Sequence, residues 1–147
     1  MSNFLSLACA LLLVFATEVL ARDEVVGPVE AEILRVVDGD TLLVEARPWP
    51  QQRVEVYVRI RGIDAPEIRS NCQQVREAGA EALRVLENLA ERSAKIQLTH
   101  ISGDKYFGRI VADVALTDGS SAAESMRSAG VVRDYYCGRK QRETCGS

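Results

Sequence analysis

VRIRGIDAPE, at residues 58–67, has the pattern of a β-strand that leads directly into a group of charged residues. From residue 53 to residue 63, aliphatic side chains alternate with charged or aromatic ones. One face of this segment carries Val54, Val56, Val58 and Ile60. A period of two predicts a strand with one buried face. The charged face of the strand is followed by two further charged residues, Asp64 and Glu67. So many charges beside a buried strand suggest a function other than contact with solvent.

Four more short segments have strand patterns: 33–37, 41–46, 94–101 and 108–116. Asp38-Gly39 joins the first two segments and is a hairpin signal. The sequence therefore predicts five strands in total.

Two helices are expected among these strands. Between residues 72 and 90, apolar side chains recur every three or four positions, which is typical of an amphipathic helix. Ser121 and Glu124 have the spacing of a capping box, and Gly130 would end the short helix that begins there. Five strands, with a long helix after the third and a short helix after the fifth, predict a mainly β fold: a closed or nearly closed barrel with helices to one side.

The chain has 147 residues, which is the length of one ordinary domain. Residues 4–16 form an apolar run with small residues beyond it, so we interpret residues 1–21 as a cleaved secretory signal peptide. Residues 22–147 then form a single domain, with a core at about 30–136 and a C-terminal tail at 137–147. We expect a secreted or periplasmic protein. An uncleaved signal that anchors it to a membrane is the alternative, because no Lys or Arg precedes the apolar run.

The overall charge does not indicate a general affinity for polyanions. The chain carries 18 Lys and Arg against 21 Asp and Glu, a formal net charge of −3 at pH 7. Non-specific binding to nucleic acid normally goes with a basic excess. A role with nucleic acid would therefore depend on a local cluster of arginines or on a metal ion.

Three acidic residues, Asp40, Asp64 and Glu67, lie at the ends of strands that would be neighbours in a small barrel. Asp40 alone could belong to a plain turn. Carboxylates that converge repel one another unless a cation lies among them, and hard oxygen ligands select Ca²⁺, Mg²⁺ or Mn²⁺. The three residues together therefore suggest a metal site.

Two arginines accompany these carboxylates. Arg59 lies five residues before Asp64, and Arg109 opens the strand after the loop at 103–108. A guanidinium offers a planar pair of donors that matches two phosphate oxygens. The solvated face of a strand is the alternative position for either arginine. Two such groups, a hard cation and a further carboxylate are the components that phosphodiester hydrolysis needs.

Three motifs resemble those of the thermonuclease (micrococcal-nuclease-like) family, and they occur in the family's order. They are VVDGDT at 36–41, VRIRGIDAPE at 58–67 and DKYFGR at 104–109, with the long helix between the last two. The resemblance covers about residues 30–136. It implies a five-stranded barrel of the oligonucleotide-binding type that cuts DNA and RNA, commonly with Ca²⁺, and leaves 3′-phosphates.

The resemblance also implies roles for individual residues. Asp40 and Asp64 would be direct carboxylate ligands of Ca²⁺, with Mg²⁺ and Mn²⁺ as alternatives, and the backbone carbonyl of Ala65 would be another ligand. Asp38 would be an outer partner of these ligands.

For the chemistry itself, the resemblance implies that Glu67 holds the attacking water as general base, and that Arg59 and Arg109 bind the scissile phosphate.

Two tyrosines are candidates for contacts with a nucleotide. Tyr106 lies in the third motif, which usually reads Asp, basic, Tyr, Gly, Arg; here Phe107 adds a residue before Gly108, which bears on how far Tyr106 can reach. Tyr136 follows Gly130 by six residues, where the family carries a base-stacking tyrosine. Packing of the tail is the alternative for Tyr136.

Two other functions are alternatives to a nuclease. One is a catalytically silent barrel that binds oligonucleotides, and the other is a structural Ca²⁺ module without nucleic acid. The presence of Arg59, Glu67 and Arg109 favours the enzyme. We expect DNA and RNA as substrates, no protein partner, and a monomer.

Three cysteines, Cys72, Cys137 and Cys145, follow the predicted signal peptide. Disulfides persist in the oxidising compartments that exported proteins reach. A bond from Cys72 to either tail cysteine would close a long loop and hold a tail that has no apolar pattern, and we favour Cys145 slightly as the partner. A bond between Cys137 and Cys145 is the alternative.

Overall fold

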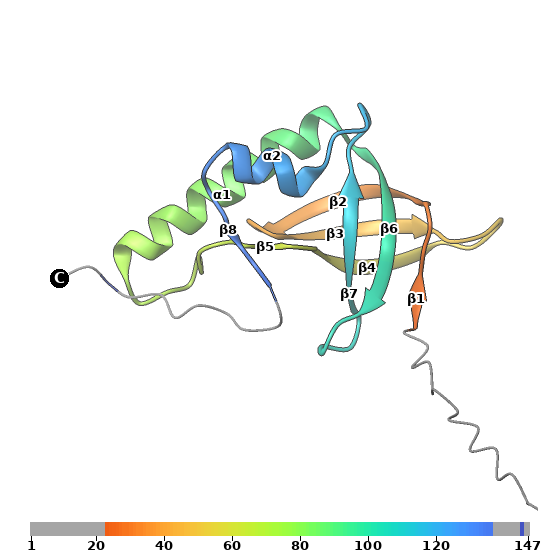
Figure 1. The fold of residues 1–147 in the computed structure, drawn as a ribbon, viewed down its shortest axis with the longest axis horizontal. Coiled ribbons are helices and arrows are strands. Elements are labelled where there is room, and N and C mark those ends of the chain that lie inside the picture. The colour runs from red at the N-terminus through yellow and green to blue at the C-terminus, as the bar shows by residue number, and fades with distance from the viewer. Residues whose placement is uncertain (1–22, 137–144, 146–147) are drawn as a thin grey trace, which may run out of the picture.

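The computed structural model describes residues 23–136 and residue 145 (Figure 1). The predicted signal peptide and Cys137 lie outside this part of the chain, so the predicted domain boundaries stay predictions. Within the described part, no helix is both long and apolar enough to cross a membrane.

Five strands form a closed barrel (Figure 1). They are β2 (Val29–Asp38), β3 (Thr41–Arg47), β4 (Val54–Ile60), β6 (Lys95–Gly103) and β7 (Arg109–Ala115). The strand order is β6-β2-β3-β4-β7, and pairing between β6 and β7 closes the sheet. Only the β4–β7 pair is parallel among these neighbours. The short strand β1 (Glu24–Val25) pairs with the end of β6, at Ile101 and Ser102. The predicted five-stranded barrel of the oligonucleotide-binding type is confirmed.

The apolar faces of the strands form the core of the barrel. Val44, Val58 and Leu98, from three different strands, are completely buried. The alternation predicted for β4 holds at its end, but Val54 at its start is 43% exposed. Figure 1 shows the reason: the hairpin of β3 and β4 extends past the barrel. Strand alternation therefore marks the core only where another element covers the face.

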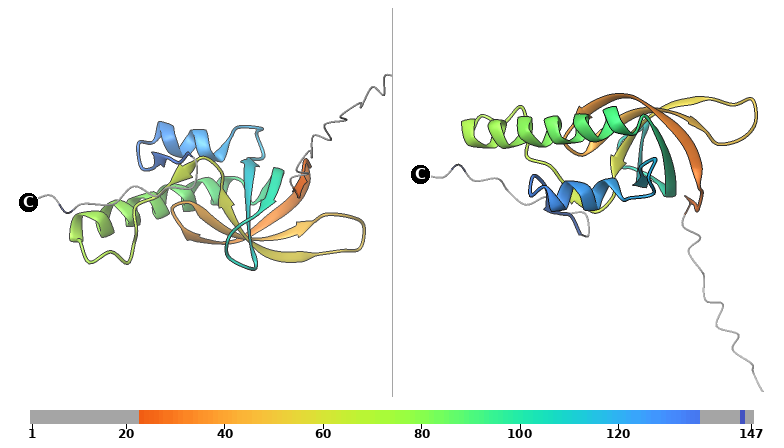
Figure 2. Two further views of the ribbon diagram at one scale, coloured as in Figure 1. Left: turned by 60° about the horizontal axis from the view of Figure 1, so that its bottom comes forward. Right: turned by 90° about the horizontal axis from the view of Figure 1, so that it is seen from above.

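Both predicted helices are present, and both lie to one side of the barrel (Figure 2). The long helix α1 (Gln73–Arg92) buries the apolar stripe that the sequence showed, including Ala82 and Leu86. In the short helix α2 (Ala122–Ser128), the hydroxyl of Ser121 accepts a hydrogen bond from the backbone N–H of Glu124, as the capping box predicts.

One part of the predicted topology is wrong: the strand at 53–63 is not continuous. It ends at Ile60, and Gly62 turns the chain with a φ of 82°, a conformation that only glycine adopts without strain. The next strand, β5 (Ile63–Asp64), pairs with β8 (Arg133–Asp134), which follows α2. The chain after α2 thus returns to support the segment that carries Asp64.

Candidate active site

A cleft of about 600 Å³ opens where the ends of β3, β4 and β5 face the loop between β6 and β7. Most of the site residues predicted from the motifs line it: Asp38, Asp40, Arg59, Asp64, Ala65, Glu67, Tyr106 and Arg109. Tyr136 does not line the cleft and is 70% exposed. The fold therefore gathers residues from three distant motifs into one place.

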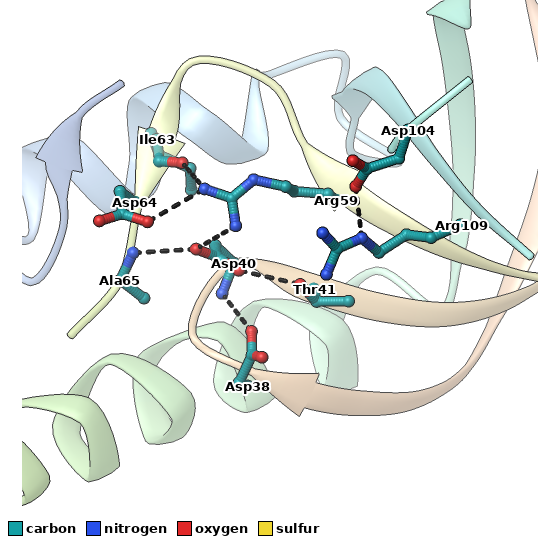
Figure 3. A network of polar contacts seen from close by, with 9 residues as sticks. All are labelled: Asp38, Asp40, Thr41, Arg59, Ile63, Asp64, Ala65, Asp104 and Arg109. Carbon is teal, nitrogen blue, oxygen red and sulfur yellow. Dashed lines mark hydrogen bonds and ion pairs between the residues drawn. The ribbon is translucent and has the colours of Figure 1, made fainter. Parts of the chain in front are cut away.

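Asp40 is a buried acidic residue of the cleft that several hydrogen bonds hold in place (Figure 3). Its carboxylate is buried and accepts hydrogen bonds from the Thr41 hydroxyl at 2.9 Å and from the Ala65 backbone N–H at 3.0 Å. The Asp38 carboxylate accepts the backbone N–H of Asp40 at 3.1 Å. Asp38 thus positions Asp40 through the backbone.

Arg59 connects the two buried aspartates. One end of its guanidinium donates to Asp40 Oδ2 at 3.0 Å, and the other donates to Asp64 Oδ1 at 3.0 Å and to the Ile63 carbonyl at 3.2 Å. The pairing of Thr41 with Arg59 between β3 and β4 accounts for this proximity. Burial raises the pKa of Asp40, and the neighbouring Asp38 raises it further, whereas Arg59 acts in the opposite direction. A positive charge beside Asp40 therefore stabilises its ionised form.

Arg109 enters the same cleft from β7. In the parallel pairing of β4 with β7 it lies opposite Tyr57, two residues before Arg59 on the same face. Its Nε donates to the Asp104 carboxylate, and its guanidinium lies 4.6 Å from the centre of the Tyr106 ring. Figure 3 shows the Arg109 side chain reaching toward Arg59. The two arginines thus border one space from neighbouring strands.

Asp104 remains an effective partner for Arg109 despite being partly covered. Burial acts to raise the pKa of Asp104, but hydrogen bonds from Arg109 and from the backbone N–H of Lys105 outweigh it, so the pKa lies below its usual value. The carboxylate that holds Arg109 is therefore ionised at neutral pH.

Glu67 is an exposed residue of the cleft. Its Oε1 accepts the backbone N–H of Arg69 at 3.0 Å, and its carbonyl accepts the N–H of Ser70 at 3.1 Å. These bonds form a turn after Pro66 that holds Glu67 at the cleft, three residues after Asp64.

The donor set suits a hard divalent cation. Asp40 and Asp64 present carboxylate oxygens, and such oxygens are the ligands that Ca²⁺ and Mg²⁺ take in proteins. Arg59 donates a hydrogen bond to each of these two carboxylates. Among the residues that the structure describes, no group of three or more Asp, Glu, His or Cys side chains is placed to hold a metal ion. Ala65 contacts Asp40 through its backbone N–H, whereas the ligand predicted from the motifs is its carbonyl.

Tyr135 and Arg127 belong to the site but were not predicted. The Tyr135 ring lies 4.9 Å from the guanidinium carbon of Arg59 and lines the cleft, and its backbone N–H donates to the Gly62 carbonyl at 3.0 Å. Arg127, from α2, donates to the same carbonyl at 2.9 Å and to Asp134 at 2.7 Å. Both residues hold the turn between β4 and β5. Tyr135 lies in a segment without periodicity, and the capping box predicted the helix of Arg127 but not its partners, so the sequence carried no signal for these contacts.

A disulfide joins Cys72 to Cys145, the pairing that the sequence slightly favoured. Cys72 caps the N-terminus of α1, five residues after Glu67. The end of the chain is therefore attached beside the segment that carries Glu67.

The barrel, the cleft and the arginine–carboxylate cluster together form a nuclease-like arrangement. The family model described as staphylococcal nuclease homologue matches residues 57–145, more than half of the chain. The chain belongs to this family, which confirms the resemblance found in the motifs. The comparison with curated proteins gave no match. The family is one of metal-dependent nucleases, so nucleic acid is the class of substrate that membership implies.

Proposed function

We propose that this protein is an exported nuclease that hydrolyses phosphodiester bonds of DNA and RNA with the help of Ca²⁺. The observation that carries the proposal is the arrangement of Arg59 and Arg109, which border the same cleft as the buried pair Asp40 and Asp64. A binding barrel without catalysis would not need two buried carboxylates beside two arginines.

In this proposal Asp40, Asp64 and the carbonyl of Ala65 hold the cation, and Asp38 orients Asp40. Ca²⁺ is the first choice, and Mg²⁺ or Mn²⁺ would suit the same oxygens. When bound, the cation would compensate the charge of the carboxylates and polarise a phosphate oxygen.

The protein's own side chains supply the remaining chemistry. Arg59 and Arg109 bind the scissile phosphate and stabilise the negative charge that grows on its oxygens in the transition state. Glu67 orients a water molecule for in-line attack and accepts its proton. Water protonates the leaving oxygen, because a guanidinium is a poor proton donor.

Export is part of the proposal. A disulfide between Cys72 and Cys145 suits the oxidising compartments outside the cytoplasm. The apolar segment at 4–16 would direct the chain there and then be removed with residues 1–21, or would remain as an anchor. We propose that the exported protein acts as a monomer.

The test uses the purified protein, single- and double-stranded DNA, and RNA, each with Ca²⁺ or with a chelator. Cleavage that stops with chelator and returns with Ca²⁺ supports the proposal. Full cleavage in chelator would refute the metal's role. Binding without cleavage under every condition would instead identify a silent oligonucleotide-binding barrel.

A further inference from the structure

We propose that helix α1 is the common support of the two turns at the centre of the site. Gly79 and Ala82, on the buried face of this helix, position Glu67 and Asp40 relative to each other. The inference rests on the proposed nuclease function, because it assigns positioning residues to that site.

The backbone of the Glu67 turn lies directly against α1. Gly79 is buried inside this helix, and a methyl group on its Cα would lie 2.7 Å from the Pro66 carbonyl oxygen and 3.0 Å from the Ile68 backbone nitrogen. Non-bonded carbon atoms attract best at about 3.5 to 4.0 Å, so these distances leave no room for a side chain. Glycine weakens a helix interior relative to alanine. The close approach of the turn is therefore what requires glycine at this position.

Glu67 lies between the two residues that Gly79 contacts. Its Oε1 accepts the backbone N–H of Arg69 at 3.0 Å, and its carbonyl accepts the N–H of Ser70 at 3.1 Å. Because both bonds lie within the turn, they define its shape. The contact with Gly79 defines its position on the helix.

The turn that carries Asp40 meets α1 nearly one helical turn further along. Gly39 lies between Asp38 and Asp40. A methyl group on the Gly39 Cα would lie 2.6 Å from Cβ of Ala82 and 2.7 Å from Cβ of Ala65. Ala82 is completely buried, and Figure 3 shows Ala65 beside Asp40. The helix and both ligand segments are thus packed without space for one more methyl group.

The helix therefore relates the two turns to each other. Gly79 and Ala82 are three residues apart, so they lie on one face of α1, about 4.5 Å apart along its axis. This spacing holds Glu67 and Asp40 at a constant separation before a substrate binds. A base must lie within hydrogen-bond reach of its proton, and a misplacement of about 1 Å can cost ~10²-fold in rate. The small residues of α1 should therefore affect the rate more than substrate binding.

The first experiment adds a methyl group at the contact. In Gly79→Ala the Glu67 turn must move away from α1, so kcat should fall about ten-fold or more while KM stays within about two-fold of the native value. Ala80→Ser is the matched control. It also adds one heavy atom to α1, but at an exposed position, and should leave kcat and KM unchanged. A kcat near the native value in Gly79→Ala would overturn the inference.

The second experiment removes a methyl group, so it tests the same support even if Gly79→Ala does not fold. Ala82→Gly should loosen the turn of Asp40 and weaken Ca²⁺ binding, measured by isothermal titration calorimetry, by about ten-fold. Ala80→Gly loses the same helix propensity at an exposed position and should bind Ca²⁺ as the native protein does. Equal, native-like affinity in both variants would overturn the inference.

Amide exchange separates this inference from the nuclease proposal, because it needs neither cleavage nor a metal. The Arg69 N–H, which is bonded to Glu67 Oε1, should exchange faster in Gly79→Ala than in Ala80→Ser. This difference, with a native protein that cleaves no nucleic acid, would support the positioning and refute the nuclease. Cleavage by the native protein, with exchange and kcat unchanged in Gly79→Ala, would refute the positioning and leave the nuclease intact.

Discussion

Arg59 and Arg109 enter one cleft from two walls of different character. The anchored wall, residues 59–67, comprises the end of β4, β5 and the turn that carries Glu67. Its Arg59 side chain is 17% exposed and donates to two carboxylates and a backbone carbonyl. The loop wall, residues 104–109, has Arg109 at 26% exposure, with Asp104 as its recorded carboxylate partner.

The two walls also differ in their support. Behind the anchored wall lie β8 and Arg127, and the Cys72–Cys145 disulfide follows it in the chain. The loop wall is attached to β4 by a backbone bond from Tyr57 to Gly108 and by the strand pairing of Arg109 with Tyr57, and it carries the exposed ring of Phe107. Catalytic groups work best when they are fixed before the substrate arrives, whereas recognition is often carried by loops. The comparison thus places the buried carboxylates, Arg59 and Glu67 on a well-supported wall, and the second phosphate-binding arginine on a more exposed loop.

The largest expected effect comes from removing the disulfide behind the anchored wall. Cys72 and Cys145 are 73 residues apart, and the chain-entropy model gives about 4 kcal/mol for closing such a loop. The double variant Cys72→Ser/Cys145→Ser should lower the free energy of unfolding by about this amount, measured by denaturant titration. Amide exchange should become faster around Glu67 but not at 104–108. Cys137→Ser is the control, and a loss of stability as large in that variant would show that the pairing is different in solution.

The next effect tests the chemistry assigned to the anchored wall. Glu67→Gln keeps the size and polarity of the side chain but removes the base, so kcat should fall by roughly 10² or more. Affinity for an oligonucleotide should stay within a few-fold of the native value in an anisotropy titration. A kcat within a few-fold of native would remove Glu67 from the role of base.

Replacing each arginine by lysine compares the walls directly. Either change keeps the charge but loses the planar pair of donors, so kcat should fall by ~10² or more in both. The two variants should differ in their free energies of unfolding. Arg59→Lys leaves Asp40 and Asp64 without their shared partner and should lower the free energy of unfolding by about 1 to 3 kcal/mol, whereas Arg109→Lys should lower it less. Equal losses of stability, measured by thermal unfolding with calorimetry, would show that the two walls do not differ in support.

Periodicity and motifs were enough to predict the loop wall and the barrel but not the support of the anchored wall. The alternation in β4 and the stripe in α1 repeat over many residues, so the sequence shows them clearly. A two-residue strand has no period, and β5 and β8 therefore appear only once the chain is folded. The same holds for Arg127, whose position in a short helix gives no sign that its partner is the carbonyl of Gly62.

The pairing of charges was likewise only partly predictable. The motifs placed Asp40, Asp64 and Arg59 in one site, and the structure brings all three into contact. That Arg59 lies between the two carboxylates, and that Tyr135 covers its guanidinium, depends on side-chain geometry that a linear pattern does not contain.

The smallest expected effect concerns the support that the sequence did not reveal. Arg127→Gln removes the charged hydrogen bond to Gly62 and the pair with Asp134, so the free energy of unfolding should fall by about 1 to 2 kcal/mol. Arg84→Gln is a matched control on α1, because Arg84 also pairs with a glutamate three residues earlier but does not line the cleft. Its stability should not change measurably. If Arg127 positions the anchored wall, kcat should fall by about ten-fold while KM stays near the native value, because the phosphate ligands remain but are less well aligned. An unchanged kcat together with the loss of stability would mean that Arg127 supports the fold alone, and that the anchored wall keeps its geometry without it.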